Sequence, residues 1–562
     1  MAERRGRRMI VEFEEACRNI RQTQRNVLKD VVTHQASSEM GRAFGLARLS
    51  NPEVYRRTMP LGDYESVRPW VDRIRQSGDS TVMFDSSEKL IMFTMTSGSE
   101  GEPKHIPVTG ESYQRYRRAW FAWVTATVQD HPDALDHGVL PIVSPVEESR
   151  TPSGIACGSM SGLSMETQSR FVRSMYGIPA ALCGLSNQAE KYYAFARWCA
   201  ARPVSFLTTA NPSTWLMFAQ VMNQRREEII RDVHDGTLGI DVSGESERVK
   251  QAVRTLRPNR RRARWLEQIV RETGALRPRD VWPELKIVTN WKGGTLGHYL
   301  DLLPEWYGNT PVRDIGLLAS EGRMNIPLDD NGGAGPLDIR SHFFEFIPVE
   351  EEGSKSPTTL LAHEIEVGRD YFIVLTNFSG LHRYDIQDVV RVEGQFHECP
   401  TVRFLHKGSR FSSITGEKLS ESQVTTAVRR ASKRMGWTIV DFMLVPVWGE
   451  TPRYALMTSK ESLGGREHWP NLLLALEEHL NELNIEYLSK RKSGRLGPIS
   501  LCVVEPGVFD DMRLERIASS GGRSEQYKPT YLTGNLEFLR GLDILEWMHV
   551  DGESRSEPLV RR

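Results

Sequence analysis

The segment with the clearest chemical meaning is a run of small and hydroxylated residues that ends in a lysine. It reads Phe93-Thr-Met-Thr-Ser-Gly-Ser-Glu-Gly-Glu-Pro-Lys104, and its first residues are typical of a β-strand. Small residues let backbone N–H groups approach an anion, hydroxyl groups add donors, and a lysine supplies a positive charge. This composition favours a phosphate-binding loop formed by Thr96, Ser97, Gly98, Ser99, Gly101 and Lys104.

The loop does not have the Walker P-loop pattern. Pro103 stands where a glycine belongs, and His105 stands where a serine or threonine would bind Mg²⁺. By composition alone, an ordinary glycine-rich turn is an equal alternative to a phosphate loop. Glu100 and Glu102 would also have to point away from a bound phosphate, because like charges repel.

Three segments together carry a resemblance to a known family. Residues Thr96 to Lys104 resemble the phosphate loop of the adenylate-forming superfamily, which includes acyl-CoA ligases, peptide-synthetase adenylation domains and firefly luciferase. Leu317-Leu-Ala-Ser-Glu-Gly322 resembles the second nucleotide motif of the auxin-responsive acyl-acid amido synthetases, the Gretchen Hagen family, in its bacterial type. Leu381-His-Arg-Tyr-Asp-Ile-Gln-Asp-Val-Val390 resembles the third motif of that family.

Other matches fall in the expected order, so the resemblance spans nearly the whole chain. They are Trp282-Pro-Glu-Leu-Lys286, the Gly293-Gly294 turn and Gln526-Tyr-Lys-Pro529. The third motif normally reads Tyr-Arg-Tyr-x-x-Gly-Asp-Val. The chain departs from it at His382, which replaces a tyrosine, and at Gln387, which replaces the glycine.

The resemblance assigns roles to two carboxylates and a hydroxyl. Ser320 and Glu321 follow an expected strand at Val312–Leu318, and ligands of α/β sheets bind at the carboxyl ends of strands. Glu321 is expected to hold the Mg²⁺ that accompanies ATP, in a shell completed mostly by water. Asp388, as an acceptor-only group, is expected to bind the two ribose hydroxyls. Taken alone, Glu321 would be a surface carboxylate and Asp388 a turn aspartate.

The remaining candidates also depend on the resemblance. Gly293 and Gly294 resemble the loop that packs against adenine, although a plain strand-to-helix turn is equally consistent. Phe404 completes the set of nucleotide-binding candidates. The glycine- and serine-rich loop from Arg150 to Gly162 has no fixed motif, and direct ligand contact there is as probable as not. Lys528, like Lys104, is expected to be catalytic, as a lysine that swings over the ATP site from a small C-terminal domain.

These residues must be positioned by an α/β fold. Cys17, Val27 and other apolar residues recur at helical spacing and predict one long N-terminal helix. Farther along, helical patterns alternate with short apolar runs, which favours mostly parallel sheets. The expected helices are 113–128, 188–201 and 212–233, and the expected strands are 81–84, 89–96, 138–143, 204–208 and 285–289. The basic segment from Arg257 to Trp265 is interpreted as a solvated helix entry, with a phosphate or nucleic-acid patch as the alternative.

The pattern changes after about residue 405. Helices are expected at 420–435 and 469–488, and strands at 438–447, 453–459 and 499–504. The sequence therefore predicts a large adenylate-forming domain of mixed sheets and helices, residues 1–406, which binds ATP and the acyl group. A small, mobile α+β domain, residues 407–562, would carry Lys528.

Composition excludes several other classes of protein. A chain of 562 residues with 39% hydrophobic residues can bury large cores, which excludes wholesale disorder. Lysine and arginine number 72 against 73 acidic residues, so nothing indicates a nucleic-acid-coating protein. No run approaches the roughly 18 apolar residues that cross a bilayer. The six scattered cysteines and the charged start without an apolar signal-peptide core predict a cytoplasmic protein with no membrane partner.

The function expected from these features is that of an ATP- and Mg²⁺-dependent ligase. It would form an acyl-adenylate and pyrophosphate from a carboxylic acid, and then transfer the acyl group to an amine or amino acid. Two alternatives stay open, an acyl-CoA ligase with the same first step and a catalytically silent nucleotide-binding interaction protein. The oligomeric state is not indicated by the sequence.

Overall fold

The computed structural model describes residues 2–549, apart from 96–103, 186, 295, 355, 409–410, 413, 416, 418, 450 and 520–528. The chain divides into two compact units. The first unit comprises Met1–Gly293 and Leu302–Phe404, and the second comprises Gly294–Asp301, Leu405–Gly522 and Tyr527–Arg562. In the part of the chain that the structure describes, no helix is both long and apolar enough to cross a membrane.

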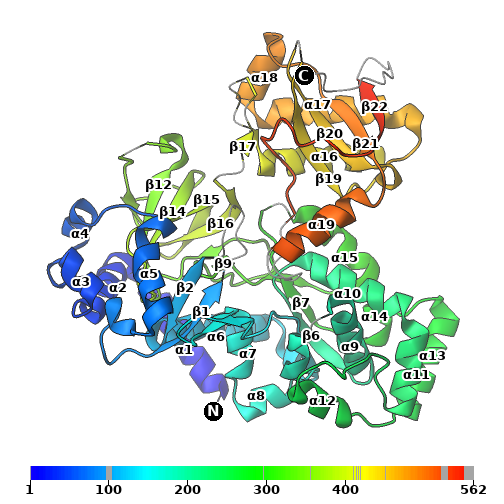
Figure 1. Ribbon diagram of the computed structural model, residues 1–562, viewed down its shortest axis with the longest axis horizontal. Helices are drawn as coiled ribbons and strands as arrows, with labels where there is room; N and C mark the ends of the chain where they lie inside the picture. Colours follow the sequence, from blue (N-terminus) through cyan, green and yellow to red (C-terminus); the bar gives the residue numbers. More distant parts are fainter. Residues whose placement is uncertain are drawn as a thin grey trace. The chain divides into compact units, whose positions relative to one another are not determined.

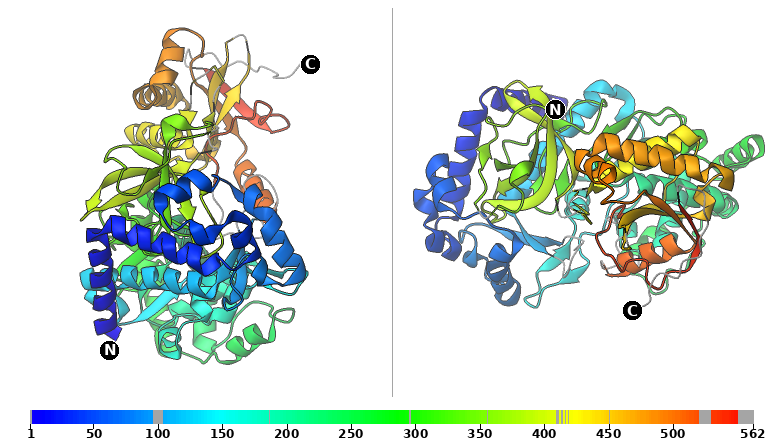
Figure 2. Two further views of the ribbon diagram at one scale, coloured as in Figure 1. Left: turned by 90° about the vertical axis from the view of Figure 1, so that its left-hand side faces the viewer. Right: turned by 90° about the horizontal axis from the view of Figure 1, so that it is seen from above.

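The N-terminus of the first unit forms two helices where the sequence predicted one. Helix α1 (Ala2–Arg18) and helix α2 (Ile20–Gln35) meet at Asn19, whose φ of −133° and ψ of 49° are not helical. Figure 2 shows the change of direction between them in its left-hand view. Phe13 and Cys17 belong to the main core of the unit, whereas Val27 packs in a separate cluster. The apolar residues of this segment are therefore shared between two clusters, and the chain changes direction between the two helices.

The first unit contains a four-stranded parallel sheet with the strand order β3-β6-β7-β8. Its strands are β3 (Gly138–Pro141), β6 (Val204–Thr208), β7 (Ile287–Asn290) and β8 (Val312–Asp314). In Figure 1, α9 (Gln188–Ala200) and α10 (Pro212–Gln224) lie beside β6 and β7. Farther from the sheet lie α11 (Arg226–Asp235), α13 (Arg260–Thr273) and α14 (Pro278–Val281). The pattern expected to form one helix over 212–233 is thus divided at Arg225.

The other sheets of the first unit are not parallel, so the expectation of mostly parallel strands was correct for one sheet only. A mixed sheet has the order β2-β1-β5-β4, in which β1 pairs antiparallel with β2 and parallel with β5. Its strands are β1 (Leu90–Met95), β2 (His105–Thr109), β4 (Ser149–Arg150) and β5 (Ala156–Gly158). The expected strand at 81–84 is wrong, because Ser80–Val82 forms a 3-10 helix.

An antiparallel sheet, with the order β11-β16-β15-β14-β12-β13, forms the third layer of the unit. Its strands are β11 (Gly335–Pro336), β12 (Phe343–Pro348), β13 (Leu360–Leu361), β14 (Asp370–Thr376), β15 (Tyr384–Phe396) and β16 (Cys399–Lys407). A separate two-stranded hairpin joins β9 (Leu318–Ala319) to β10 (Gly322–Arg323). The other helices of this unit are α3 (Glu39–Phe44), α4 (Pro52–Thr58), α5 (Tyr64–Ser77), α6 (Gly110–Asp130), α7 (Met160–Glu166), α8 (Arg170–Ser174) and α12 (Glu247–Arg254). Helix α15 (Gly297–Tyr307) is divided between the two units after Asp301.

The second unit is built on a four-stranded sheet with the order β19-β20-β21-β22. Its strands are β19 (Phe442–Val447), β20 (Arg453–Ser459), β21 (Ser500–Val504) and β22 (Ile544–His549), and β17 (Phe411–Ser412) and β18 (Leu419–Ser420) form a separate pair. Its helices are α16 (Glu421–Met435), α17 (Trp469–Leu483), α18 (Ile485–Lys492) and α19 (Val508–Ser519). Strand β22 and helix α19 were not foreseen, and the expected helix 469–488 is interrupted at Asn484, which caps α18.

The third motif forms a bulge on β15, and this explains what Gln387 does there. Val374 of β14 pairs with Asp385, and Phe372 pairs with Val389, so β15 uses four residues where β14 uses two. Gln387 lies in this bulge with a φ of 61°, in the left-handed region that favours glycine. Its backbone N–H donates to Asp385 Oδ1 over 2.7 Å. The glycine of the family pattern therefore corresponds to a backbone requirement that this chain meets with a glutamine.

We expect Gln387→Gly to raise the free energy of unfolding by about 0.5–1 kcal/mol, because the relief of left-handed strain exceeds the added entropy of the unfolded chain. Gln268→Gly is the control, since Gln268 is an exposed residue inside α13. It should lower the same free energy by a similar amount. Urea unfolding of both variants is the measurement, and shifts of the same sign would contradict the prediction.

Candidate functional site

The end of strand β1 is tied to the turn that carries Ser320 and Glu321. Thr94 Oγ1 donates to the Ser320 carbonyl oxygen over 3.1 Å, and Ser320 Oγ donates to the Met95 carbonyl oxygen over 3.1 Å. Met95 is the last residue before Thr96, so the second motif lies beside the start of the predicted phosphate loop. Thr96, Ser97, Gly98, Ser99 and Gly101 themselves lie outside the described residues.

Glu321 is buried and held at two points. The residue is 6% exposed, and its carboxylate Oε1 accepts a hydrogen bond of 3.2 Å from the Tyr384 hydroxyl. Its carbonyl oxygen accepts a bond of 2.9 Å from Asn377 Nδ2. Burial, and then the Glu321 charge, raises the pKa of Tyr384, so the phenol stays protonated and remains a donor.

Lys104, the only predicted phosphate ligand in the described part of the loop, connects to the third motif through a neighbouring loop. Its Nζ lies 5.8 Å from the centre of the Tyr64 ring. The Tyr64 hydroxyl accepts a hydrogen bond of 2.8 Å from the His105 N–H. Two residues before Tyr64, Gly62 exchanges backbone hydrogen bonds with β15, as acceptor from Asp385 N over 2.8 Å and donor to the Arg383 oxygen over 3.0 Å.

Asp388 lies directly after Gln387, at the end of the β15 bulge, and is 7% exposed. Tyr384, Ile386 and Asp388 are all buried, whereas Gln387 is exposed. The bulge therefore turns the aspartate inward, on the same strand that presents Tyr384 to Glu321. Ribose binding by Asp388 remains a prediction.

The Gly293 turn and Phe404 lie against each other. A Cβ atom on Gly293 would come within 3.2 Å of the Phe404 carbonyl oxygen. The turn is also fixed by Asp314, at the end of β8, whose Oδ2 accepts a hydrogen bond of 2.6 Å from the Lys292 N–H. Burial raises the pKa of Asp314 to about 6. Gly294 follows with a φ of 68°. The structure thus brings Gly293 and Phe404 together, and the binding of a base by the three candidates remains a prediction.

Three residues that sequence reasoning missed hold these candidates in place, namely Asn377, Tyr384 and Asp314. Tyr384 is part of the third motif, and Asp314 lies within the strand expected at Val312–Leu318, so both had a signal in the sequence. That expected strand was too long, because β8 ends at Asp314. Asn377 had none, because it lies in the turn between β14 and β15 and reaches Glu321 only through tertiary contacts.

The loop from Arg150 to Gly162 also reaches β1. Strand β5 pairs with β1 in register, with Phe93 opposite Cys157 and Thr94 opposite Gly158. Gly158 packs so closely on a neighbouring segment that an added Cβ would lie 2.1 Å from the Val146 carbonyl oxygen. Gly158 and Gly162 therefore have a packing reason, whereas Gly154 has a φ of 88° and an added Cβ there would meet no described atom within 4 Å. The proximity of this loop to a ligand remains a prediction.

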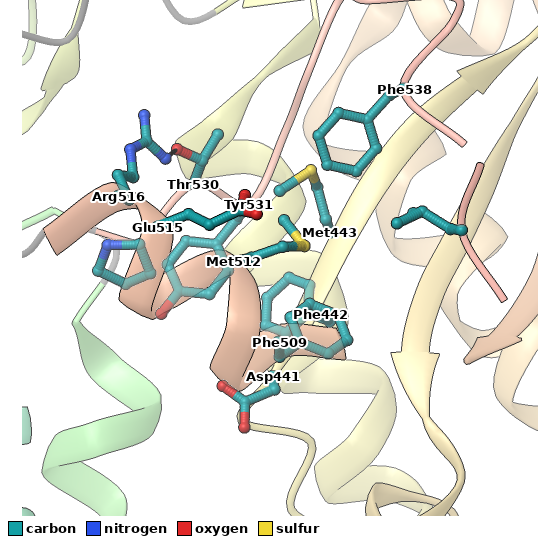
Figure 3. A pocket seen from close by; sticks show the side chains of 12 residues that line it. Asp441, Phe442, Met443, Phe509, Met512, Glu515, Arg516, Thr530, Tyr531 and Phe538 are labelled. Carbon is teal, nitrogen blue, oxygen red and sulfur yellow. Dashed lines mark hydrogen bonds between the residues drawn. The ribbon is translucent and has the colours of Figure 1, made fainter. Parts of the chain in front are cut away.

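In the second unit, Lys528 lies outside the described residues, but the chain that follows it is anchored. Tyr531 N donates to Glu421 Oε1 over 2.7 Å, and its carbonyl oxygen accepts a bond of 2.8 Å from Leu444 N. A pocket of about 510 Å³ opens beside this segment (Figure 3). Its walls are mainly aromatic and methionine side chains from β19, α19 and the segment before β22: Phe442, Met443, Phe509, Met512 and Phe538.

The donor set fits Mg²⁺ only as part of a metal–nucleotide complex. Among the residues that the structure describes, no three or more His, Cys, Asp or Glu side chains gather as a metal site. Glu321 is a single buried carboxylate beside the strand that leads into the predicted phosphate loop. Mg²⁺ commonly binds through one or two carboxylates together with substrate phosphates and water.

Comparison with known families covers most of the chain. Residues 9–312 match the GH3 family N-terminal domain, residues 335–407 the GH3 family central domain, and residues 422–537 the GH3 family C-terminal domain. The chain belongs to the GH3 family. The resemblance inferred from the three nucleotide motifs is thereby confirmed.

Curated relatives match this GH3 chain over nearly its full length. It is 22% identical over 539 residues to indole-3-acetic acid-amido synthetase GH3.3 of Arabidopsis thaliana, with 92% of this chain and 90% of the relative covered. It is 25% identical over 567 residues to jasmonoyl–L-amino acid synthetase GH3.5 of Oryza sativa subsp. japonica, with 92% and 93% covered. It is 23% identical over 553 residues to 4-substituted benzoates-glutamate ligase GH3.12 of Arabidopsis thaliana, with 92% and 93% covered.

A solved structure shows the same fold. The GH3.15 acyl acid amido synthetase superimposes with a TM-score of 0.81 and 22% sequence identity, covering 95% of this GH3 chain and 96% of that chain. The expected fold class, a large α/β part with mixed sheets followed by a smaller α+β part, is confirmed.

Proposed function

We propose that this GH3-family protein is an ATP-dependent acyl acid amido synthetase. It joins a carboxylic acid to an amine, with an amino acid as the expected acceptor. The observation that carries the proposal is the family match over nearly the whole chain, whose curated relatives are named as amido synthetases and ligases. The geometry around Glu321, at the end of the strand leading to the phosphate loop, supports it.

The reaction has two steps. In the first, a carboxylate oxygen of the acid attacks the α-phosphorus of ATP, and the bond to pyrophosphate breaks. In the second, the amine nitrogen attacks the carbonyl carbon of the acyl-adenylate, AMP leaves, and the nitrogen loses a proton to give the amide. The first unit binds ATP and the acid, and the second contributes Lys528. The residues act by positioning and charge stabilisation rather than as covalent nucleophiles.

In this assignment, the phosphates are bound by six residues of the loop: Thr96, Ser97, Gly98, Ser99, Gly101 and Lys104. Asp388 binds the ribose, and Gly293, Gly294 and Phe404 bind the base. Glu321 holds the Mg²⁺ of the metal–nucleotide complex, and that ion offsets phosphate charge. Ser320 acts through the position of the turn, since its hydroxyl is bonded to Met95. We place the protein in the cytoplasm, where its six buried cysteine thiols would stay reduced.

A panel of carboxylic acids tests the proposal directly. With ATP, Mg²⁺ and hydroxylamine, the correct acid should give a trapped hydroxamate together with AMP and pyrophosphate. When hydroxylamine is replaced by a mixture of amino acids and coenzyme A, mass spectrometry should detect an amide rather than a thioester. Carboxylate-dependent formation of ADP without AMP would contradict the proposal. A dominant CoA thioester would show that the protein is an acyl-CoA ligase instead.

A further inference from the structure

Glu321 is held by the turn that connects β14 to β15. Asn377, which follows β14, binds the Glu321 backbone, and Tyr384, which begins β15, binds the carboxylate. The position of this carboxylate therefore depends on how firmly the turn itself is fixed. Asn377 also closes the turn, because its N–H donates to the Leu381 oxygen over 2.9 Å and its Oδ1 accepts from Ser379 N over 2.9 Å.

A chain of buried hydrogen bonds fixes the turn to two N-terminal helices. The His382 ring lies between the Tyr55 hydroxyl of α4, 2.9 Å from Nδ1, and Gln35 Oε1 of α2, 2.7 Å from Nε2. Gln35 Nε2 donates in turn to the Asn377 carbonyl oxygen over 3.0 Å. Tyr55 also bonds with Thr376 Oγ1 over 3.0 Å. Tyr55, Gln35 and Thr376 are 0% exposed, and His382 is 5% exposed.

The direction of every proton in this chain can be assigned. Gln35 uses its amide nitrogen on Asn377, so its oxygen faces His382 and the imidazole must carry its proton on Nε2. Burial lowers the pKa of His382 to about 4, so the ring is neutral near pH 7 and its Nδ1 is an acceptor. The Tyr55 hydroxyl therefore donates to Nδ1, and the Thr376 hydroxyl donates to Tyr55. Each hydrogen bond in this chain then has one donor and one acceptor.

We propose that His382 is a positioning residue for the Mg²⁺–ATP site, acting on Glu321 through Gln35 and Asn377. The inference rests on the proposed function, because it takes Glu321 as the residue that meets the metal–nucleotide complex. The imidazole has an acceptor at Nδ1, which meets Tyr55 of α4, and a donor at Nε2, which meets Gln35 of α2, so the ring connects the two helices. The tyrosine of the family pattern has a single polar atom in its side chain. His382 thus defines a linkage that belongs to this chain rather than to the motif.

Two variants break the chain of hydrogen bonds at different points. Tyr55→Phe removes the donor to Nδ1 and keeps the ring, while His382→Phe removes both imidazole contacts. Tyr307→Phe is the matched control, because Tyr307 is 2% exposed and its hydroxyl donates to the Trp215 oxygen over 2.7 Å, in the same unit. Each protein is titrated with ATP in a calorimeter, once with Mg²⁺ and once with EDTA, and without a carboxylic acid substrate. The ratio of the two affinities for ATP measures how much Mg²⁺ strengthens ATP binding.

We expect the Mg²⁺-dependent gain in ATP affinity to fall by about 10-fold in Tyr55→Phe and in His382→Phe. An effect of this size is found when groups that orient a metal ligand are removed. Tyr307→Phe should keep the wild-type gain while losing a similar amount of stability. Wild-type gain in a folded Tyr55→Phe protein, or an equal loss in Tyr307→Phe, would overturn the role of His382. A wild-type protein that binds ATP but forms no adenylate with any acid would instead overturn the proposed function, and with it the inference.

Discussion

Arg383→Met should lower the free energy of unfolding of the first unit by about 3–5 kcal/mol, the range expected when one partner of a buried ion pair is removed. Arg383 forms an ion pair with Glu345, with Nη2 2.9 Å from Oε1 and Nε 2.9 Å from Oε2. The two side chains are 8% and 1% exposed. The variant would leave the Glu345 carboxylate buried without its cation, which is the main source of the expected loss.

Arg383 also satisfies three acceptors that a methionine cannot reach. Its Nη1 donates to the carbonyl oxygens of Arg56 over 2.7 Å and Met59 over 2.8 Å, and its Nη2 donates to Thr359 Oγ1 over 2.9 Å. Arg56 lies in α4 and Met59 is its C-cap. With the two donors to Glu345, all five guanidinium N–H groups are used. One residue of the third motif thus attaches an N-terminal helix to the antiparallel sheet.

Arg391→Met is the control for this prediction. Arg391 is also bidentate, to Asp370 over 2.7 and 2.8 Å, and it lies on β15, the strand that begins directly after Arg383, but its side chain is 45% exposed. An exposed pair contributes roughly 0–1 kcal/mol, so this variant should change stability little. Urea unfolding monitored by tryptophan fluorescence compares the two. Equal losses would show that Arg383 does not have the anchoring role assigned here.

Lys528→Ala should slow acyl-adenylate formation by roughly 10²–10³-fold and leave amide formation from supplied acyl-adenylate nearly intact. The carboxylate and the α-phosphate are both anionic, and an ammonium group placed between them offsets the charge that builds up as they approach. In the second step the acyl–phosphate bond already exists, so this repulsion is absent. The resemblance to the adenylate-forming superfamily assigns the lysine to the first step alone.

The measurement separates the two half-reactions on one purified variant. Pyrophosphate release reports the first, and amide formation from synthetic acyl-adenylate reports the second. Lys492→Ala, at the exposed end of α18, controls for loss of a positive charge elsewhere in the second unit and should affect neither rate. Equal losses in both half-reactions would refute the division of labour. An unchanged first rate would show that Lys528 is an ordinary surface lysine.

The motifs and the structure answer different questions about the same residues. The motifs indicated which segments belong to a nucleotide site, but not which members of a motif face a ligand. Ser320 and Arg383 show the difference, since the first bonds to the Met95 carbonyl and the second to Glu345 and helix α4. Both are motif residues whose observed contacts are internal. Substituting either would remove these internal contacts and so alter the backbone position of its motif.

The sequence by itself determined the family, the order of the nucleotide motifs and most of the regular elements of the parallel sheet and the second unit. Such features are local, because they depend on residue type and on spacing within one helix, strand or loop. For this reason the strand at Arg453–Ser459 was predicted to the residue, and helix α16 to within one. The sequence also showed that Gln387 replaces the glycine of the family pattern, but not that this residue lies in a β-bulge with a positive φ.

Only the tertiary structure decided how N-terminal helices take part in the site. Gln35 and His382 lie 347 positions apart, and no local pattern relates them. The division of the N-terminal helix at Asn19 has the same origin, since one apolar stripe packs in two clusters. Burial then fixed the chemistry, because it lowers the pKa of His382 and makes any unsatisfied donor of Arg383 costly. The motifs of the site are thus short segments of sequence, but the contacts that hold them in place come from helices far away in the chain.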